Sequence, residues 1–174
     1  MKQLSETIRS IPDFPKKGIV FRDITTLLKD ADALHNAVEL LKNKYENSRI
    51  DKVVCIESRG FILGSALAVS LGAGFVPIRK KGKLPAEVIR EQYALEYGTD
   101  EIEMHVDAIK SGDRILLHDD LLATGGTMCA AIKLVEKLQG KIVGVSFLIE
   151  LSFLKGRTHI NNYDIFSLVK YDKE

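Results

Sequence analysis

Two adjacent acids followed by a loop of small residues form the segment with the clearest chemical meaning. Asp119 and Asp120 come shortly after the apolar run 115–117. The small residues that follow, here called the phosphate loop, are Ala123, Thr124, Gly125, Gly126 and Thr127. Glycines let backbone N–H groups approach a phosphate closely, and a helix that begins there adds unpaired donors and the positive end of its dipole. The loop is therefore predicted to hold a terminal phosphate, and its threonines can add hydroxyl donors.

The acid pair, Asp119 and Asp120, needs a task other than phosphate binding, because carboxylates repel phosphate. Accepting hydrogen bonds from two sugar hydroxyls is the simplest such task, and a ribose 5-phosphate carries both the hydroxyls and a nearby phosphate. Charge-assisted hydrogen bonds of this kind contribute roughly 1.5–3 kcal/mol each. A solvated acidic turn at a strand end explains the two acids alone about equally well, but not the acids and the loop together. The chain has neither a GxxxxGK[ST] nor a GxGxxG pattern.

Three helices and several short strands must position this segment. Apolar residues recur at helical spacing over 34–45 and 128–138, and a further helix is predicted over 60–71, with Gly72 ending it. Short apolar runs predict strands, and these are residues 53–56, 75–78, 115–117, 142–149 and 165–169. Continuous apolar strands that alternate with helices predict an α/β fold, a central mostly parallel sheet flanked by helices. Ligands of such sheets bind beyond the carboxyl ends of the strands, where the phosphate loop is expected.

Residues 86–107 follow a different pattern. The acidic or polar residues Glu101, Glu103 and His105 alternate with apolar ones, a period of two that predicts a half-buried strand. Residues 97–100 before this strand are typical of a turn. The segment is therefore predicted to be a hairpin-like excursion inserted between two halves of the sheet.

Composition narrows the class of protein. The chain has 174 residues, enough for one domain over 1–174, and 25 basic against 24 acidic residues give a net charge of +1. That balance argues against nucleic acid or a membrane surface as a partner. Cys55 and Cys129 lack CxxC spacing and the histidines lack metal-ligand spacing, so a reducing cytoplasm and no transition-metal site are expected. The uncharged run 61–78 contains glycines, serines and a proline, which suit a buried helix, a turn and a strand better than a membrane span.

The segment 114–127 resembles the phosphoribosyl pyrophosphate signature of the type I phosphoribosyltransferase family. The chain is similar to the adenine-specific members of that family over nearly its whole length. The blocks that carry this likeness are 12–15 with 18–24, 57–61, 78–85 and 93–98.

The resemblance implies a type I phosphoribosyltransferase-like fold and transfer of a 5-phosphoribosyl group from its pyrophosphate (PRPP) to N9 of adenine. The products are AMP and diphosphate, in a reaction of purine salvage. A hood segment at about residues 1–30 would bind the base, and a mobile hairpin at about 82–107 would close over the substrates. The resemblance also implies Mg²⁺, held mainly through the substrate, and a homodimer.

The resemblance assigns roles to single residues as well. The phosphate loop would bind the 5′-phosphate, and the acid pair would bind the ribose hydroxyls. The residues implied for the diphosphate are Ser58, Arg59, Arg79 and Lys83. Fixed cations suit a leaving group that gathers negative charge, whereas Lys80 and Lys81 are interpreted as ordinary surface cations. A non-proline cis peptide is expected at Glu57-Ser58.

The resemblance also implies residues that bind the base and residues that take part in catalysis. Backbone groups of Val20 and Arg22 would read the adenine edge, with Phe21 nearby, although Phe21 and Phe14 could equally be core aromatics. Glu96 and Tyr97, at the hairpin tip, are the implied catalytic residues, with Glu96 handling the proton at the purine. A closing hairpin would exclude water, which would otherwise hydrolyse the donor. The alternative is that Glu96 and Tyr97 lie in a solvated turn with no catalytic role.

Three further alternatives accompany these expectations. His118 precedes the acid pair and is interpreted as a satisfied core histidine or, secondarily, as a site contact. A purine-responsive regulator with this fold is one other function, but only about 50 residues precede the first predicted strand of the sheet. A related enzyme for 6-oxopurines is another, and the N-terminal block argues against it.

Overall fold

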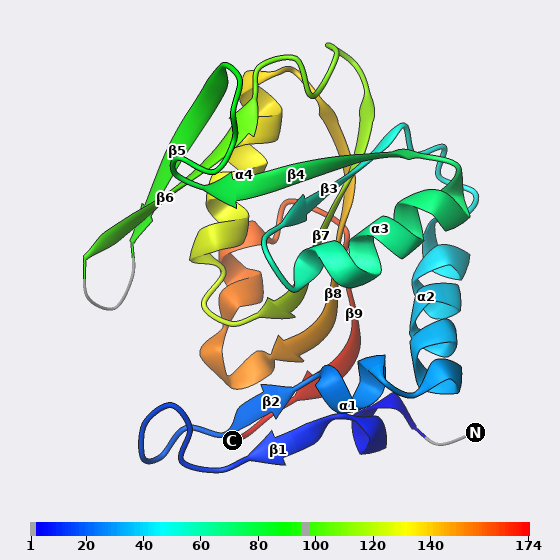
Figure 1. Ribbon diagram of the computed structural model, residues 1–174, viewed down its shortest axis with the longest axis vertical. Helices are drawn as coiled ribbons and strands as arrows, with labels where there is room; N and C mark the ends of the chain where they lie inside the picture. Colours follow the sequence, from blue (N-terminus) through cyan, green and yellow to red (C-terminus); the bar gives the residue numbers. More distant parts are fainter. Residues whose placement is uncertain (1–2, 95–97) are drawn as a thin grey trace.

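A seven-stranded sheet forms the centre of the protein in the computed structural model, which describes residues 3–94 and 98–174 (Figure 1). The strands lie in the order β5-β6-β4-β3-β7-β8-β9. The parallel strands are β4 (Gly74–Lys80), β3 (Lys52–Ile56), β7 (Arg114–Leu122), β8 (Lys141–Leu151) and β9 (Ile165–Tyr171). The predicted mostly parallel α/β sheet is confirmed.

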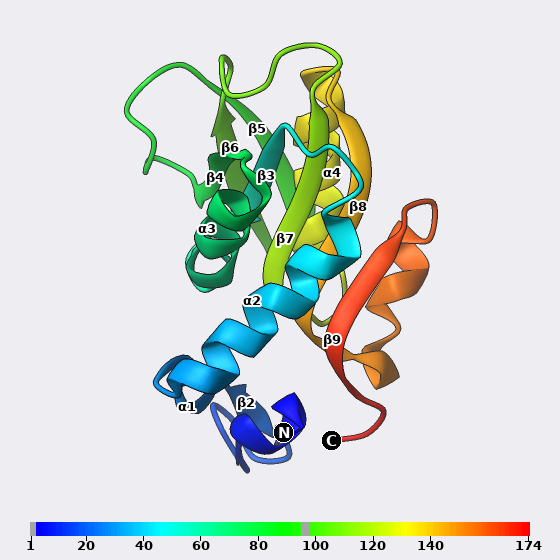
Figure 2. The ribbon, with the colours of Figure 1, turned by 90° about the vertical axis from the view of Figure 1, so that its right-hand side faces the viewer.

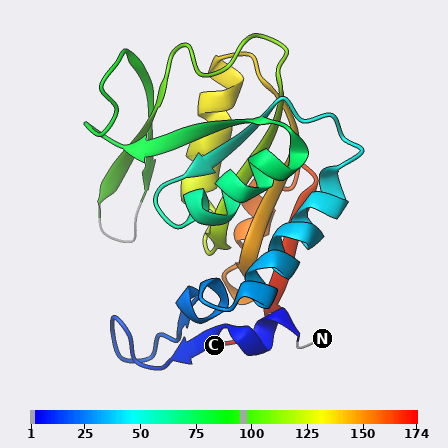
Figure 3. The same ribbon diagram turned by 45° about the vertical axis from the view of Figure 1, so that its right-hand side comes forward.

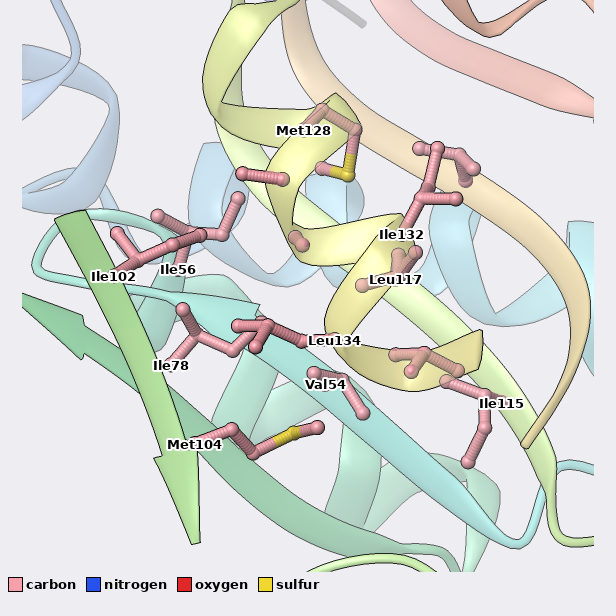
Figure 4. Close-up of a cluster of buried hydrophobic side chains, with 14 of the residues drawn as sticks. Val54, Ile56, Ile78, Ile102, Met104, Ile115, Leu117, Met128, Ile132 and Leu134 are labelled. Carbon is pink, nitrogen blue, oxygen red and sulfur yellow. The ribbon is translucent and has the colours of Figure 1, made fainter. Parts of the chain in front are cut away.

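Helices cover both faces of this sheet (Figure 2). α2 (Ala31–Tyr45) and α3 (Gly60–Leu71) lie on one face, and α4 (Gly126–Lys137) lies on the other. Alternate residues of β3 serve the two faces, since Val54 and Ile56 pack toward α4 whereas Val53 and Cys55 pack toward α2 and α3. Figure 4 shows the cluster under α4, where Met128 and Leu134 meet the strands. Each large side chain buried in this way contributes about 1.5–3 kcal/mol.

The three predicted helices are present, with small shifts at their ends. α2 begins three residues before the predicted apolar pattern because the Asp30 carboxylate accepts hydrogen bonds from the N–H groups of Asp32 and Ala33, both at 3.1 Å. α3 ends at Leu71 as expected, with Gly72 in the left-handed conformation at φ 66°.

β7 is longer than its apolar run predicts. It continues through the acid pair to Leu122, and Asp119 pairs with Phe147 of β8. Leu122 is buried, which extends the sheet core past the acids. The acids therefore lie within the last part of the strand, not on the loop after it, and their backbone is held by ladder hydrogen bonds.

The predicted excursion is an antiparallel hairpin of β5 (Val88–Ala94) and β6 (Thr99–His105). It extends the sheet beyond β4 instead of lying between two halves of it (Figure 1). Thr99 and Asp100 pair with Ala94 and Tyr93 of β5, so the last two residues of the predicted turn, 97–100, belong to β6. The predicted alternation of buried apolar and exposed polar residues is wrong at Glu103, whose exposed fraction is only 1%.

The N-terminal hood segment has its own small sheet, which the hydrophobic pattern does not predict. The 3₁₀ helix η1 (Leu4–Thr7) precedes β1 (Arg9–Ile11) and β2 (Phe21–Asp23), which pair antiparallel, and α1 (Thr25–Leu28) follows. This segment and the C-terminal end of β9 lie at the same end of the protein (Figure 3).

Two further 3₁₀ helices, η2 (Ser152–Leu154) and η3 (Gly156–Ile160), join β8 to β9. Within the described ranges, no helix has both the length and the apolar character needed to cross a membrane.

Candidate active site

A cavity of about 290 Å³ lies beyond the carboxyl ends of β3 and β7. Side chains from the turn after β3, from the end of β7, from the start of α4 and from the hairpin line it. Of the residues singled out in the sequence, those in its lining are Ser58, Arg59, Asp119, Asp120 and Thr127. The sheet topology thus brings together residues that are more than sixty positions apart in the chain.

The acid pair faces a fixed cation. The Nε atom of Arg59 lies 2.8 Å from Oδ2 of Asp120, and the N–H of Asp120 donates to Oδ1 of Asp119 at 2.8 Å. Burial and the neighbouring Asp120 charge raise the pKa of Asp119 well above its usual value. Burial also raises the pKa of Asp120, against the opposing effect of Arg59. Both carboxyl groups lack the solvation that an exposed acid has, so they gain from ligand hydroxyls that donate to them.

Helix α3 must approach the acid pair closely. A Cβ atom at Gly60 would lie 2.8 Å from Oδ1 of Asp119, so only a glycine leaves room for this carboxylate at the start of the helix. The same carboxylate therefore lies at the N-terminus of a 12-residue helix, where the helix dipole favours negative charge.

The phosphate loop lies where β7 passes into α4. Gly125 is the residue before the helix and has φ 86°, a left-handed value that glycine adopts without strain. Its carbonyl oxygen accepts the first helical hydrogen bond, from the N–H of Cys129 at 2.9 Å. Thr127 lines the cavity and Thr124 is exposed. The N–H groups at the start of α4 are thus free of helical partners, as a phosphate site needs.

A buried carboxylate organises the opposite side of the cavity. Oε1 of Glu57 lies 3.1 Å from the Lys83 Nζ atom and accepts from the Lys80 N–H at 2.6 Å, and Oε2 accepts from Nε of Arg79 at 3.1 Å. Burial raises the pKa of Glu57, but these three donors outweigh it and lower the pKa overall. Glu57 lines the cavity, whereas Arg79 and Lys83 reach it through Glu57.

The base-binding segment touches the same cation as the acid pair. The Phe21 ring lies 5.3 Å from the Arg59 guanidinium and packs edge-to-face on Phe14 at 5.2 Å. The Arg22 side chain points elsewhere, with its guanidinium 3.9 Å from the Tyr171 ring centre. Neither these residues nor Val20 line the cavity described above. Arg59 therefore contacts both the Phe21 ring and the acid pair.

The chain is similar to known proteins over nearly its whole length. Residues 23–171 match the phosphoribosyl transferase domain family. An adenine phosphoribosyltransferase of Halothermothrix orenii is 60% identical over 97% of this chain and 99% of its own length. The crystal structure of the enzyme of that name from Thermoanaerobacter pseudethanolicus has a TM-score of 0.93 at 52% identity, covering 97% of this chain and 98% of that one.

This chain belongs to the adenine phosphoribosyltransferase family.

A more distant member of the family has the same architecture. The Giardia lamblia enzyme, solved in complex with 9-deazaadenine, is 40% identical and has a TM-score of 0.91 over 98% of this chain and 99% of that one. The predicted family and fold are therefore confirmed.

Three further expectations have different outcomes. The cis peptide at Glu57-Ser58 is present. His118 is fully buried with Nδ1 2.9 Å from Oγ of Ser146, which makes it a core histidine, and burial lowers its pKa to about 4. Glu96 and Tyr97, the implied catalytic residues of this family member, lie outside the described residues.

Two residues at the site were missed by sequence reasoning. Lys80, expected as a surface cation, lines the cavity, and its Nζ atom lies 2.9 Å from Oδ2 of Asp100. Glu103 accepts from the backbone N–H groups of Lys83 and Leu84, both at 3.1 Å, and so shapes the loop that presents Lys83. Burial raises the pKa of Glu103, but these N–H donors and Arg90 outweigh it and lower the pKa. The sequence gives one signal for the role of Glu103, an acidic residue in the middle of a predicted strand.

Proposed function

We propose that this protein transfers the 5-phosphoribosyl group of PRPP to N9 of adenine and releases AMP and diphosphate. The observation that carries the proposal is the acid pair placed next to the phosphate loop in one cavity, opposite Ser58 and Arg59. The similarity to adenine phosphoribosyltransferases over nearly the full length supports adenine as the acceptor.

The phosphate loop, residues 123–127, binds the 5′-phosphate through backbone N–H groups and threonine hydroxyls in this proposal. Asp119 and Asp120 accept hydrogen bonds from the ribose hydroxyls, and Arg59 then shares Asp120 with the sugar. These contacts fix C1′ of the donor in the cavity. The bond from C1′ to the diphosphate oxygen breaks, a bond from C1′ to N9 of adenine forms, and the N9 proton leaves.

The leaving diphosphate needs positive charge, because it takes the electron pair of the broken bond. Ser58 and Arg59 face the cavity directly, and Arg79 and Lys83 stand behind Glu57. We propose that all four bind the diphosphate, the last two by exchanging Glu57 for the ligand. Glu57 is buried and would keep the Lys80 N–H as a donor, while the diphosphate oxygens would replace its carboxylate as partners of the two half-exposed cations.

The cavity fits Mg²⁺ that arrives with PRPP. The acid pair in its lining, Asp119 and Asp120, offers the oxygen donors that Mg²⁺ prefers. In the described parts of the chain there is no group of three or more acidic, histidine or cysteine side chains able to hold a metal. The substrate oxygens would then supply most of the ligands, and the ion would add positive charge at the leaving group.

The hood segment, about residues 1–30, binds adenine in this proposal. Backbone groups of Val20 and Arg22 face the base edge, and Phe21 lies beside it, next to Arg59. Glu96 takes part in proton transfer at the purine and Tyr97 helps to close the hairpin, about residues 82–107, over the substrates. The chain 1–174 would then act as one catalytic domain.

A second copy of the chain is the proposed partner. α3 is apolar on nearly all sides, yet Ile62 and Val69 are 44% and 82% exposed, and Phe75 of β4 beside it is 37% exposed. A helix that is apolar all round is normally buried. We therefore propose a homodimer through this face, in the cytoplasm, where the free Cys55 and Cys129 would remain reduced. Val69→Glu should shift sedimentation from dimer to monomer, and an unchanged dimer would refute this interface.

A substrate panel tests the proposed activity. Purified protein is incubated with PRPP and Mg²⁺, and adenine, hypoxanthine, guanine and xanthine are offered separately while diphosphate release is followed. Release with adenine, and at least about a hundredfold less with the three oxopurines, is expected, because a 6-oxopurine needs a cationic donor to its exocyclic oxygen at C6. Preference for an oxopurine would refute adenine specificity, and no release with any base would refute the transferase activity.

A further inference from the structure

The phosphate loop is backed by a turn of chain that the sequence analysis did not single out. η3 lies beside the start of α4 (Figure 1), and its first residue, Gly156, is buried. A Cβ atom at Gly156 would lie 2.1 Å from the carbonyl oxygen of Ala123 and 3.0 Å from the nitrogen of Gly125. The first separation is far below any van der Waals contact. A side chain at this position would therefore displace the phosphate loop.

The contact is reciprocal. A Cβ atom at Gly125 would lie 2.8 Å from the carbonyl oxygen of Gly156. Lys155, which precedes this glycine, has φ 55°, a left-handed value that is unusual for a residue with a side chain. The two backbones thus meet without intervening side chains. Residues 155–157 are here called the backing turn, and its first residue, Lys155, is held in a costly conformation that the surroundings must maintain.

A half-buried ion pair anchors the backing turn to the sheet. Arg157 binds Glu150 at the end of β8 with two bonds, from Nε at 2.9 Å and from Nη2 at 2.6 Å, and its Nη1 donates to the Ile165 carbonyl oxygen at 3.1 Å. The Glu150 side chain is only 5% exposed, and Ser167 Oγ donates to it at 2.7 Å. Bidentate pairs of this kind fix direction as well as distance. None of these residues lines the cavity described above.

We propose that Gly156 and the Arg157–Glu150 pair are positioning residues for the phosphate loop. They hold the backbone of residues 123–125 so that its N–H groups and the start of α4 face the 5′-phosphate. The inference rests on the proposed function of that loop. Its physical reason is that backbone donors bind an anion well only when they are fixed in place before the ligand arrives, and displacements of an ångström or less matter.

A pair of glycine substitutions tests the steric part. Gly156→Ala is compared with Gly140→Ala, whose Cβ atom would also be crowded, 2.8 Å from a Val135 side-chain carbon and 3.0 Å from one of Ile115, but beyond the far end of α4. The dissociation constant for ribose 5-phosphate is measured by calorimetry beside the thermal midpoint. Gly156→Ala is expected to weaken binding at least tenfold, and Gly140→Ala less than twofold. Equal affinities in the two variants would overturn the proposal.

Arg157 variants keep the test decisive if Gly156→Ala does not fold. Arg157→Lys keeps the charge but loses the second bond, and Arg157→Leu loses both. The affinity for ribose 5-phosphate is expected to fall about threefold in Arg157→Lys and tenfold or more in Arg157→Leu. In turnover measurements, the KM for PRPP should rise, with a smaller change in kcat. Unchanged KM in Arg157→Leu would overturn the positioning role. Wild-type protein that does not bind ribose 5-phosphate would instead refute the phosphate-loop assignment itself.

Discussion

The two sides of the cavity are built in different ways. On the side of β7 and α4, the acid pair lies in a paired strand, and glycines at positions 60, 125 and 156 allow backbone to pack directly against the site. On the side of the hairpin, charged side chains pair with one another, with Glu57 and Glu103 at the centres of two networks. The first side has its shape before any ligand arrives. The second has its charges neutralised internally, and a ligand must compete for them.

The difference suits the two ends of the donor. The ribose 5-phosphate end keeps its bonds through the reaction, so a rigid site can hold it from start to finish. The diphosphate end changes charge and must depart, and half-exposed ion pairs can re-form as it leaves. Arg79 and Lys83 side chains are 36% and 49% exposed, so solvent could reach both cations during the proposed exchange.

Removal of the acid pair should have the largest effect. Asp119→Ala with Asp120→Ala should weaken PRPP binding by about 10²–10⁴-fold, because two charge-assisted hydrogen bonds of roughly 1.5–3 kcal/mol each are lost. Calorimetry with PRPP and Mg²⁺ measures this loss. Asp107→Ala with Asp172→Ala, a pair of exposed acids, changes the net charge equally and should leave the affinity unchanged. Undiminished binding in the first variant would remove the acids from donor recognition.

Replacement of Glu96 should show the opposite pattern on the hairpin side. Glu96→Leu is expected to lower kcat by about 10²-fold, since general acid–base catalysis contributes typically 10²–10⁴-fold, while the affinity for PRPP stays within threefold. Glu46→Leu, an equivalent change at an exposed position beyond α2, is the control. Full turnover in Glu96→Leu would exclude this residue from the mechanism.

His118 offers a pH test of the rigid side. Burial lowers its folded-state pKa to about 4 from an ordinary value of 6.5. Between these values the unfolded chain takes up a proton that the folded protein does not, so stability present at pH 7 is lost as the pH falls. At pH 5 the loss from this group is about 2 kcal/mol. Urea unfolding should therefore show a flatter pH profile for His118→Leu than for wild type or for the exposed control His35→Leu, and parallel profiles would contradict the burial argument.

A change in salt concentration should distinguish the two sides of the cavity, and its effect on binding is expected to be the smallest of those predicted. Raising KCl from 0.05 to 0.5 M is expected to weaken inorganic diphosphate binding by about tenfold and ribose 5-phosphate binding by about threefold, because exposed charges are screened more than uncharged backbone donors. Calorimetry at the two salt concentrations gives both ratios. Equal ratios would mean that the hairpin side is no more dependent on exposed charge than the other.

The sequence predicted well what is local and poorly what depends on distant partners. Gly125 belongs to a continuous strand–loop–helix pattern, and Gly72 ends α3 where the apolar pattern stops, so both could be placed in advance. Glu57 could not be interpreted, because its partners Lys80 and Lys83 lie on a later strand and loop. Gly156 gives no local signal either, since its reason for being glycine is the backbone of Ala123 some thirty positions earlier. The β1–β2 pair of the hood segment is too short to show a hydrophobic period.

The contact of Phe21 with Arg59 has a practical consequence. The chain contains no tryptophan, so Phe21→Trp would introduce a single indole beside the guanidinium that also binds Asp120. Its fluorescence would report on both substrates from one position: a base that enters beside the ring should quench or shift the emission, and a sugar that draws Arg59 toward itself should change it in another way. Stopped-flow recording of that one optical signal could then establish the order in which the two substrates arrive.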